Sequence, residues 1–129
     1  MTLRIVRLGS PRQAEEGPRI GTVRRPPRGV PANEFASQDW YDVWYPELSP
    51  SAELVKLALS GRTAADWAAF VKRFKREMTL PSPSRTLALL AVLSHSANFS
   101  LGCYCEREDR CHRSVLRELL RAHGAKLAP

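Results

Sequence analysis

The stretch Phe99-Ser100-Leu101-Gly102-Cys103-Tyr104-Cys105 decides the fold, because it is an apolar, alternating run typical of a β-strand. A charged loop of five residues, Glu106 to Arg110, follows it. Cys111-His112-Arg113-Ser114 then opens a strongly amphipathic helix that we expect to end at Gly124. A strand tip, a short loop and a helix N-terminus therefore meet at one place, which holds all three cysteines of the chain.

The local geometry predicts which side chains meet there. Alternate residues of a strand share a face, so Cys103 and Cys105 should point the same way. Cys111 and His112 each begin a series of apolar residues spaced by four, which places both at the start of the buried stripe of the helix. We predict Asp109 as the N-cap of this helix. Two thiols, an imidazole and an arginine should therefore converge beside a helix N-terminus, where anions are favoured.

The rest of the chain supplies further strands and helices. We predict strands over residues 3–8 and 19–24, and helices over residues 50–60, 63–80 and 85–94. Ser49 is the expected N-cap of the first helix, and Thr63 with Asp66 suggests a capping box for the second. The helix over 85–94 is apolar nearly all round, which predicts burial between layers. We expect residues 1–129 to form a single α/β domain, with a small, largely parallel sheet covered by helices.

Two other stretches could carry function. Arg25 and Arg28 lie in a proline-stiffened loop after the second predicted strand, and they are either solvated or form an anion clamp, since guanidinium groups suit phosphate and carboxylate. Residues 38–46 hold two tryptophans and two tyrosines. Such a segment is either a packing lid over the core or a surface on which a base or sugar stacks.

Composition limits the class of protein. The 129 residues carry a formal net charge of +7, which favours nucleic acid or another anionic partner. Arginine supplies most of the positive charge, a bias that GC-rich coding also produces. The chain has no stretch typical of a signal peptide or a membrane span, so we expect no membrane association. An odd number of closely spaced cysteines does not suit a disulfide framework, and we expect a cytoplasmic protein with free thiols.

Three interpretations of the cysteine cluster stay open. In the first, Cys103, Cys105, Cys111 and His112 bind zinc, for which they have the right count. Strand residues two apart are ~6.5–7 Å apart at Cα, and adjacent helix residues diverge, so we expect no tightly bound metal. In the second, the thiols are buried and only fill space. The chain has no glycine-rich phosphate-binding motif, and we expect no cofactor.

In the third interpretation, the same cluster is an active or binding site. A thiol beside a helix N-terminus and positive charges should have a lowered pKa. Cys103 or Cys105 would then be the nucleophile and His112 the acid/base or orienting group. An anion would be held by three arginines: Arg113, Arg25 and Arg28. The ligand would be small and phosphorylated or nucleotide-like, in an enzyme or a binding protein; the alternatives are a basic nucleic-acid-binding module and a structural zinc protein.

The pattern Cys103-Tyr104-Cys105-Glu106 followed by Cys111-His112-Arg113-Ser114 resembles the signature of the DUF488 family, which is mostly bacterial and uncharacterised. The resemblance extends upstream to Arg25, to Pro27-Arg28-Gly29, to Trp40 and to residues 50–54, and so covers nearly the whole chain. It implies an α/β fold and supplies no established reaction.

Overall fold

The strand β4 (Phe99–Cys103) lies inside a four-stranded sheet with the order β1-β4-β2-β3. The computed structural model describes all 129 residues. β1 (Leu3–Arg7) and β2 (Arg19–Gly21) flank β4 on its two sides, and β3 (Val43–Trp44) forms the far edge. Every pairing is parallel, and all five residues of β4 are buried. A continuous buried strand is typical of the centre of a parallel sheet, which confirms the predicted α/β class.

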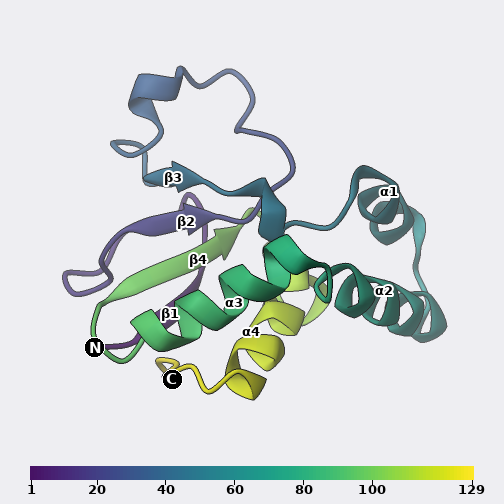
Figure 1. Ribbon diagram of the computed structural model, residues 1–129. Helices are drawn as coiled ribbons and strands as arrows, with labels where there is room; N and C mark the ends of the chain where they lie inside the picture. Colours follow the sequence, from purple (N-terminus) through teal and green to yellow (C-terminus); the bar gives the residue numbers. More distant parts are fainter.

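The helices form one layer against one face of the sheet. α3 (Pro81–Leu93) and α4 (His112–Ala122) lie along the strands, while α1 (Ala52–Ser60) and α2 (Ala64–Glu77) pack beyond the strand ends (Figure 1). Three short 3₁₀ turns complete the chain, at Ala32–Glu34, Pro46–Leu48 and Glu108–Arg110. Phe99 and Leu101 face the helices and pack in the main core with Leu116 and Leu120 of α4. The apolar stripe of α4 therefore buries itself against β4, as its periodicity predicts.

Loops cover the opposite face of the sheet and require small residues in the strands. A Cβ atom on Gly102 would lie 2.5 Å from Cδ2 of Leu8, and one on Gly21 would lie 2.4 Å from Cδ2 of Tyr41. Glu16 and Arg19 form a fully buried ion pair on the same side. The loops before β2 and before β3 can therefore approach the sheet closely without a helix between them.

Several predicted boundaries differ from those in the structure. The N-cap of α1 is Ser51, whose Oγ atom accepts a hydrogen bond from the Leu54 backbone at 3.3 Å. Ser49, the expected cap, is buried and donates to the Pro46 carbonyl instead. The capping box of Thr63 and Asp66 is confirmed. α2 ends at Glu77, and α3 begins at Pro81, a residue suited to the first turn of a helix.

The prediction that the third helix is buried all round was wrong. α3 buries Leu87, Leu90 and Ala91 against the core. Leu89 and Val92 are 58% and 70% exposed, because only one side of the helix faces the rest of the protein. The strand β3 was also not predicted, since its two residues give no periodic signal. None of the helices combines the length and apolar character needed to cross a membrane.

Candidate functional site

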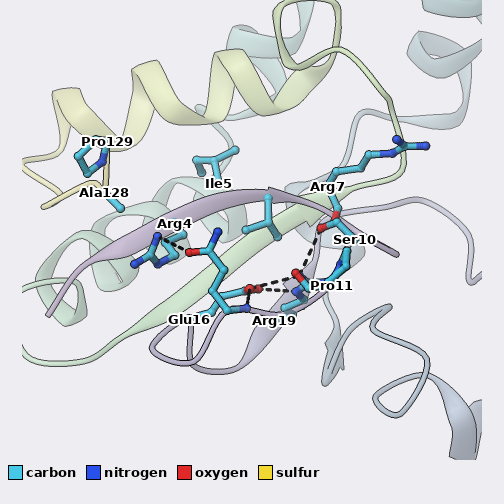
Figure 2. Close-up of a pocket in the computed structure, with 11 residues that line it drawn as sticks. Arg4, Ile5, Arg7, Ser10, Pro11, Glu16, Arg19, Ala128 and Pro129 are labelled. Carbon is cyan, nitrogen blue, oxygen red and sulfur yellow. Dashed lines mark hydrogen bonds and ion pairs between the residues drawn. The ribbon is translucent and has the colours of Figure 1, made fainter.

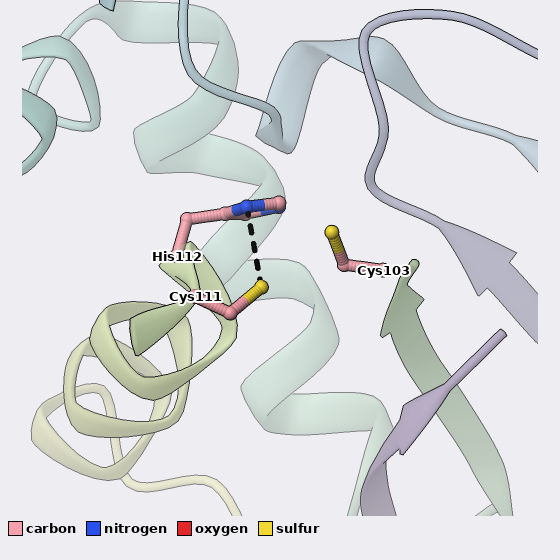
Figure 3. A group of neighbouring side chains, drawn as sticks. All are labelled: Cys103, Cys111 and His112. Carbon is pink, nitrogen blue, oxygen red and sulfur yellow. Dashed lines mark hydrogen bonds between the residues drawn. The ribbon is translucent and has the colours of Figure 1, made fainter. Parts of the chain in front are cut away.

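The cysteine cluster lies where β4 ends and α4 begins (Figure 3). Cys103 is the last residue of β4, Cys111 directly precedes α4, and His112 is its first residue. The ligand atoms of these three buried residues all lie within 4.8 Å of one another. The Sγ atom of Cys105 lies 3.8 Å from that of Cys103, and Cys105 is exposed to solvent. The predicted convergence of thiols and imidazole is therefore present in the structure.

His112 is held in one orientation by the chain that leaves β2. Its Nε2 atom lies 2.7 Å from the carbonyl oxygen of Thr22, which can only accept a hydrogen bond, so Nε2 carries the proton. The opposite ring atom, Nδ1, lies 3.7 Å from Sγ of Cys111. The ring of Phe74 packs edge-on against the imidazole, with 5.6 Å between the ring centroids. The free position of the imidazole therefore points into the cluster.

The N-cap of α4 is Cys111, and the prediction of Asp109 was wrong. Asp109 instead accepts two hydrogen bonds from Arg107 at the surface, at 3.1 and 2.7 Å. Cys111 has extended backbone angles, φ −122° and ψ 151°, and lies outside the helix. Its side chain therefore does not follow the helical rotation to the next residue, and Cys111 and His112 both reach the cluster.

Arg113, in the first turn of α4, is hydrogen-bonded to the backbone of the cysteine loop. It is buried, and its Nη2 atom donates to the carbonyl oxygen of Cys105 at 2.6 Å. Its Nε atom is buried and has no hydrogen-bond partner. No ion pair of the chain includes Arg113. A buried guanidinium with a free donor and no carboxylate partner is unusual, because arginine is rarely buried unless paired.

The structure does not bring the side chains of Arg25 and Arg28 into the cluster. Both residues are exposed, and their side chains form no hydrogen bond within the chain. The loop itself does meet the cysteine loop, because the hydroxyl group of Tyr104 donates to the Arg25 carbonyl at 2.9 Å. The neighbouring Arg24 instead donates to the carbonyl groups of Ser49 and Pro50.

Sequence reasoning missed Arg7 and Thr22. Arg7 is the register partner of Cys103 in the parallel pairing of β1 with β4, so the two residues lie side by side at the strand ends. Its Nη2 atom lies 3.8 Å from a carboxylate oxygen of Glu106 in the cysteine loop. Arg7 and Thr22 can be assigned to the site only when the order of the strands is known, because no local sequence pattern predicts which strands lie beside β4.

The thiols of the cluster titrate together. Hydrogen bonds from the Cys103 and Cys105 thiols lower the pKa of Cys111, and His112 adds to this effect, while burial opposes it. The same contacts with Cys105 and Cys111, together with burial, raise the pKa of Cys103. A single negative charge in the cluster would therefore reside on Cys111. Three sulfur atoms and one imidazole nitrogen are also the donor types that zinc accepts.

Two cavities lie away from the cysteines. One of about 260 Å³ follows the outer edge of β1, where the Glu16–Arg19 ion pair forms part of its wall (Figure 2). Arg4 also lines it and donates to the side chain of Gln13 at 3.3 Å. The other, of about 300 Å³, lies between α1 and α2 and reaches Arg110 of the cysteine loop. Neither cavity is lined by a cysteine.

The fold and the site together define an α/β protein with a cysteine–histidine–arginine cluster at the carboxyl end of its central strand. A family model described as the active DUF488-N3 subclade matches residues 3–124. The chain therefore belongs to the DUF488 family. No curated protein and no solved structure was found to match it.

Proposed function

We propose that the cysteine loop binds a small phosphorylated or nucleotide-like anion, on which the protein acts as an enzyme or a binding protein. The proposal rests on the observation that Arg113 is buried without a counter-ion. The residue is only 4% exposed, its Nε atom has no partner, and no carboxylate neutralises it. A buried charge without a counter-ion is costly, and an anionic ligand would supply both the charge and the missing acceptor.

The position of Arg113 suits such a ligand. Its hydrogen bond to the Cys105 carbonyl fixes one end of the guanidinium and leaves the Nε–H free to donate. α4 runs from His112 to Ala122, and its N-terminus directs backbone N–H groups and a positive dipole end to the same region. Charge-assisted hydrogen bonds to an oxyanion are worth ~1.5–3 kcal/mol each when partly desolvated.

Solvent exposure and orientation suggest a different role for each residue of the cluster. Cys105 is the exposed thiol and the proposed nucleophile, while Cys103 and Cys111 are buried. A hydrogen bond with Cys103 lowers the pKa of Cys105, but the contact with Cys111 and burial outweigh it and raise that pKa, so the Cys111 thiolate would accept the proton of Cys105 when Cys105 reacts. His112 orients the cluster through its fixed imidazole. Arg7, Arg25 and Arg28 would attract an anion from solvent without forming its primary site. The description of the matching subclade as active agrees with a catalytic role.

We also propose that the protein works in the cytoplasm. Its three cysteines are free, and a reducing compartment would keep the closely spaced thiols of Cys103 and Cys105 in that state.

Thermal unfolding in the presence of phosphate, sulfate or a nucleotide tests the proposal. At constant ionic strength, each anion that binds should raise the Tm of the wild type. Arg113→Lys keeps the charge but not the planar fork, and should weaken binding by roughly tenfold or more. Arg73→Lys, at an exposed position of α2, is the matched control and should leave the response intact.

Two results would overturn this function. An unchanged response in Arg113→Lys would show that Arg113 is not the anion site. A response to short oligonucleotides that Arg113→Ala and Arg73→Ala reduce equally would indicate diffuse electrostatic binding. The net charge of +7 makes that nucleic-acid module the relevant competitor.

A further inference from the structure

We infer that Cys103, Cys105, Cys111 and the Nδ1 atom of His112 form a zinc site. The ligand atoms of the three buried residues lie within 4.8 Å of one another, and Cys105 Sγ lies beside Cys103 Sγ. Three thiolates and one imidazole are a common ligand set of closed, tetrahedral zinc sites. No other group of three or more such side chains in the chain lies this close together.

Two of the separations between the ligand atoms match a tetrahedron around one ion. Two sulfur ligands ~2.3 Å from a tetrahedral zinc ion lie about 3.8 Å apart, and a sulfur and a nitrogen ligand lie about 3.6 Å apart. The Sγ atoms of Cys103 and Cys105 are 3.8 Å apart. Cys111 Sγ and His112 Nδ1 are 3.7 Å apart. The ion therefore requires little movement of these pairs.

His112 also forms the additional hydrogen bond that is typical of a zinc-bound histidine. A metal-bound histidine almost always donates its second ring N–H to a carbonyl or carboxylate, which fixes the ring and its tautomer. Here Nε2–H donates to the carbonyl of the fully buried Thr22 at 2.7 Å. This leaves the lone pair of Nδ1 directed at the cysteines, which is the state that coordination requires.

The structure removes the two reasons for expecting no metal. Cys103 and Cys105 do not both lie on an extended strand, because β4 ends at Cys103, and their Sγ atoms are 3.8 Å apart. Cys111 and His112 do not diverge as two adjacent helical residues would, because the backbone of Cys111 is extended. Both pairs of neighbours can therefore serve one ion.

This inference goes beyond the proposed anion site at Arg113 and does not depend on it, but it assigns Cys105 to the metal in place of the nucleophilic role proposed above. Zinc would bind the three sulfurs as thiolates and release their protons to solvent. It would join the end of β4, the cysteine loop and the start of α4 at one point. Cys105, the exposed ligand, would form the outer side of the centre.

Elemental analysis of the full chain, purified without a chelator or a metal column, is the direct test. We expect about one zinc ion per chain in the wild type. Cys111→Ser and His112→Ala should each lose most of the zinc, whereas His123→Ala, at an exposed position at the opposite end of the same helix, should retain it. Cys105→Ser should also lose zinc, because the inferred site has four protein ligands.

A second measurement keeps the inference testable if these variants fail to fold. Wild-type protein stripped by a chelator is titrated with Co²⁺, and absorption between thiolate and metal is recorded. We expect thiolate-to-metal bands that saturate at about one equivalent and disappear when Zn²⁺ is added. Zinc-free wild-type protein that also develops no such bands would overturn the inference, as would full zinc retention in Cys111→Ser.

The zinc site and the anion site can fail separately. Arg113→Lys should keep its zinc while its response to phosphate falls. A response to phosphate in protein that binds neither zinc nor Co²⁺ would leave the anion site standing alone. If zinc binds but no response to phosphate depends on Arg113, the zinc site would stand and the anion site would not. Arg113 would then be the counter-ion of the zinc centre, which carries a net negative charge with three thiolates.

Discussion

The Nε2 atom of His112 lies 2.7 Å from the carbonyl oxygen of Thr22, so the residue that follows β2 sets the orientation of the imidazole at the start of α4. The Thr22 side chain supports the same region. Its hydroxyl group donates to the Gly102 carbonyl at 3.0 Å and lies 3.2 Å from His112 Nε2. The segment after β2 is therefore tied both to the end of β4 and to the start of α4 beside the cysteine cluster.

Thr22→Val should destabilise the fold by about 1–2 kcal/mol, because it removes a buried hydroxyl group that bonds the Gly102 carbonyl. The backbone carbonyl that orients His112 remains in this variant. Urea unfolding measures the change. Thr79→Val, which removes an exposed hydroxyl group bonded to the Arg76 carbonyl, is the control and should cost less than about 0.5 kcal/mol. Equal costs would contradict the role given to Thr22.

Glu16→Gln should destabilise the protein by about 3 kcal/mol near neutral pH, because it leaves Arg19 buried without its counter-ion. Burial alone would raise the pKa of Glu16, but hydrogen bonds from Arg19 and from the Gln13 backbone outweigh it and lower the pKa below its ordinary value of 4.5. A carboxyl group with a lowered folded pKa contributes stability above its unfolded pKa, and this contribution is lost as the pH falls through the folded pKa.

The free-energy difference between wild type and Glu16→Gln should therefore shrink as the pH is lowered from about 5. Chemical unfolding at a series of pH values measures it. Glu15→Gln, which changes an exposed neighbour, should differ from the wild type by no more than about 0.5 kcal/mol at any pH. A difference for Glu16→Gln that does not vary with pH would contradict the lowered pKa.

Gly102→Ala should destabilise the fold by about 1–3 kcal/mol, because the new Cβ atom would lie 2.5 Å from Cδ2 of Leu8. Leu8→Ala removes the atoms that clash, so the double variant Leu8→Ala/Gly102→Ala should cost less than the sum of the two single changes. Thermal unfolding of all four proteins gives the coupling energy. Additive effects would indicate that the loop after β1 does not pack on Gly102.

Much of the fold and part of the site could be predicted from local sequence patterns. Strand alternation placed Cys103, and the start of the buried helical stripe placed Cys111 and His112, so their convergence was predictable. Thr22 and Arg7 were missed because their contribution depends on β1 and β2 being the neighbours of β4. Strand order is set by long-range packing, which no pattern within one segment records.

Other differences have a similar origin. The composition of α3 predicts burial but not how many sides are covered, and the structure leaves Leu89 and Val92 exposed. Asp109 is a good N-cap by residue type, but Arg107 engages its carboxylate in the loop. A strong local preference was overridden there by a competing partner two residues away.

The central claim is that the free Nε–H of Arg113 receives an anion, and nuclear magnetic resonance of the arginine Nε–H groups tests it most directly. One Nε–H signal, identified by its loss in Arg113→Lys, should move on titration with inorganic phosphate and saturate, while the signals of Arg73 and the other exposed arginines stay in place at constant ionic strength. If the Arg113 signal does not move, or if many arginine signals move together without saturation, the anion site proposed here does not exist.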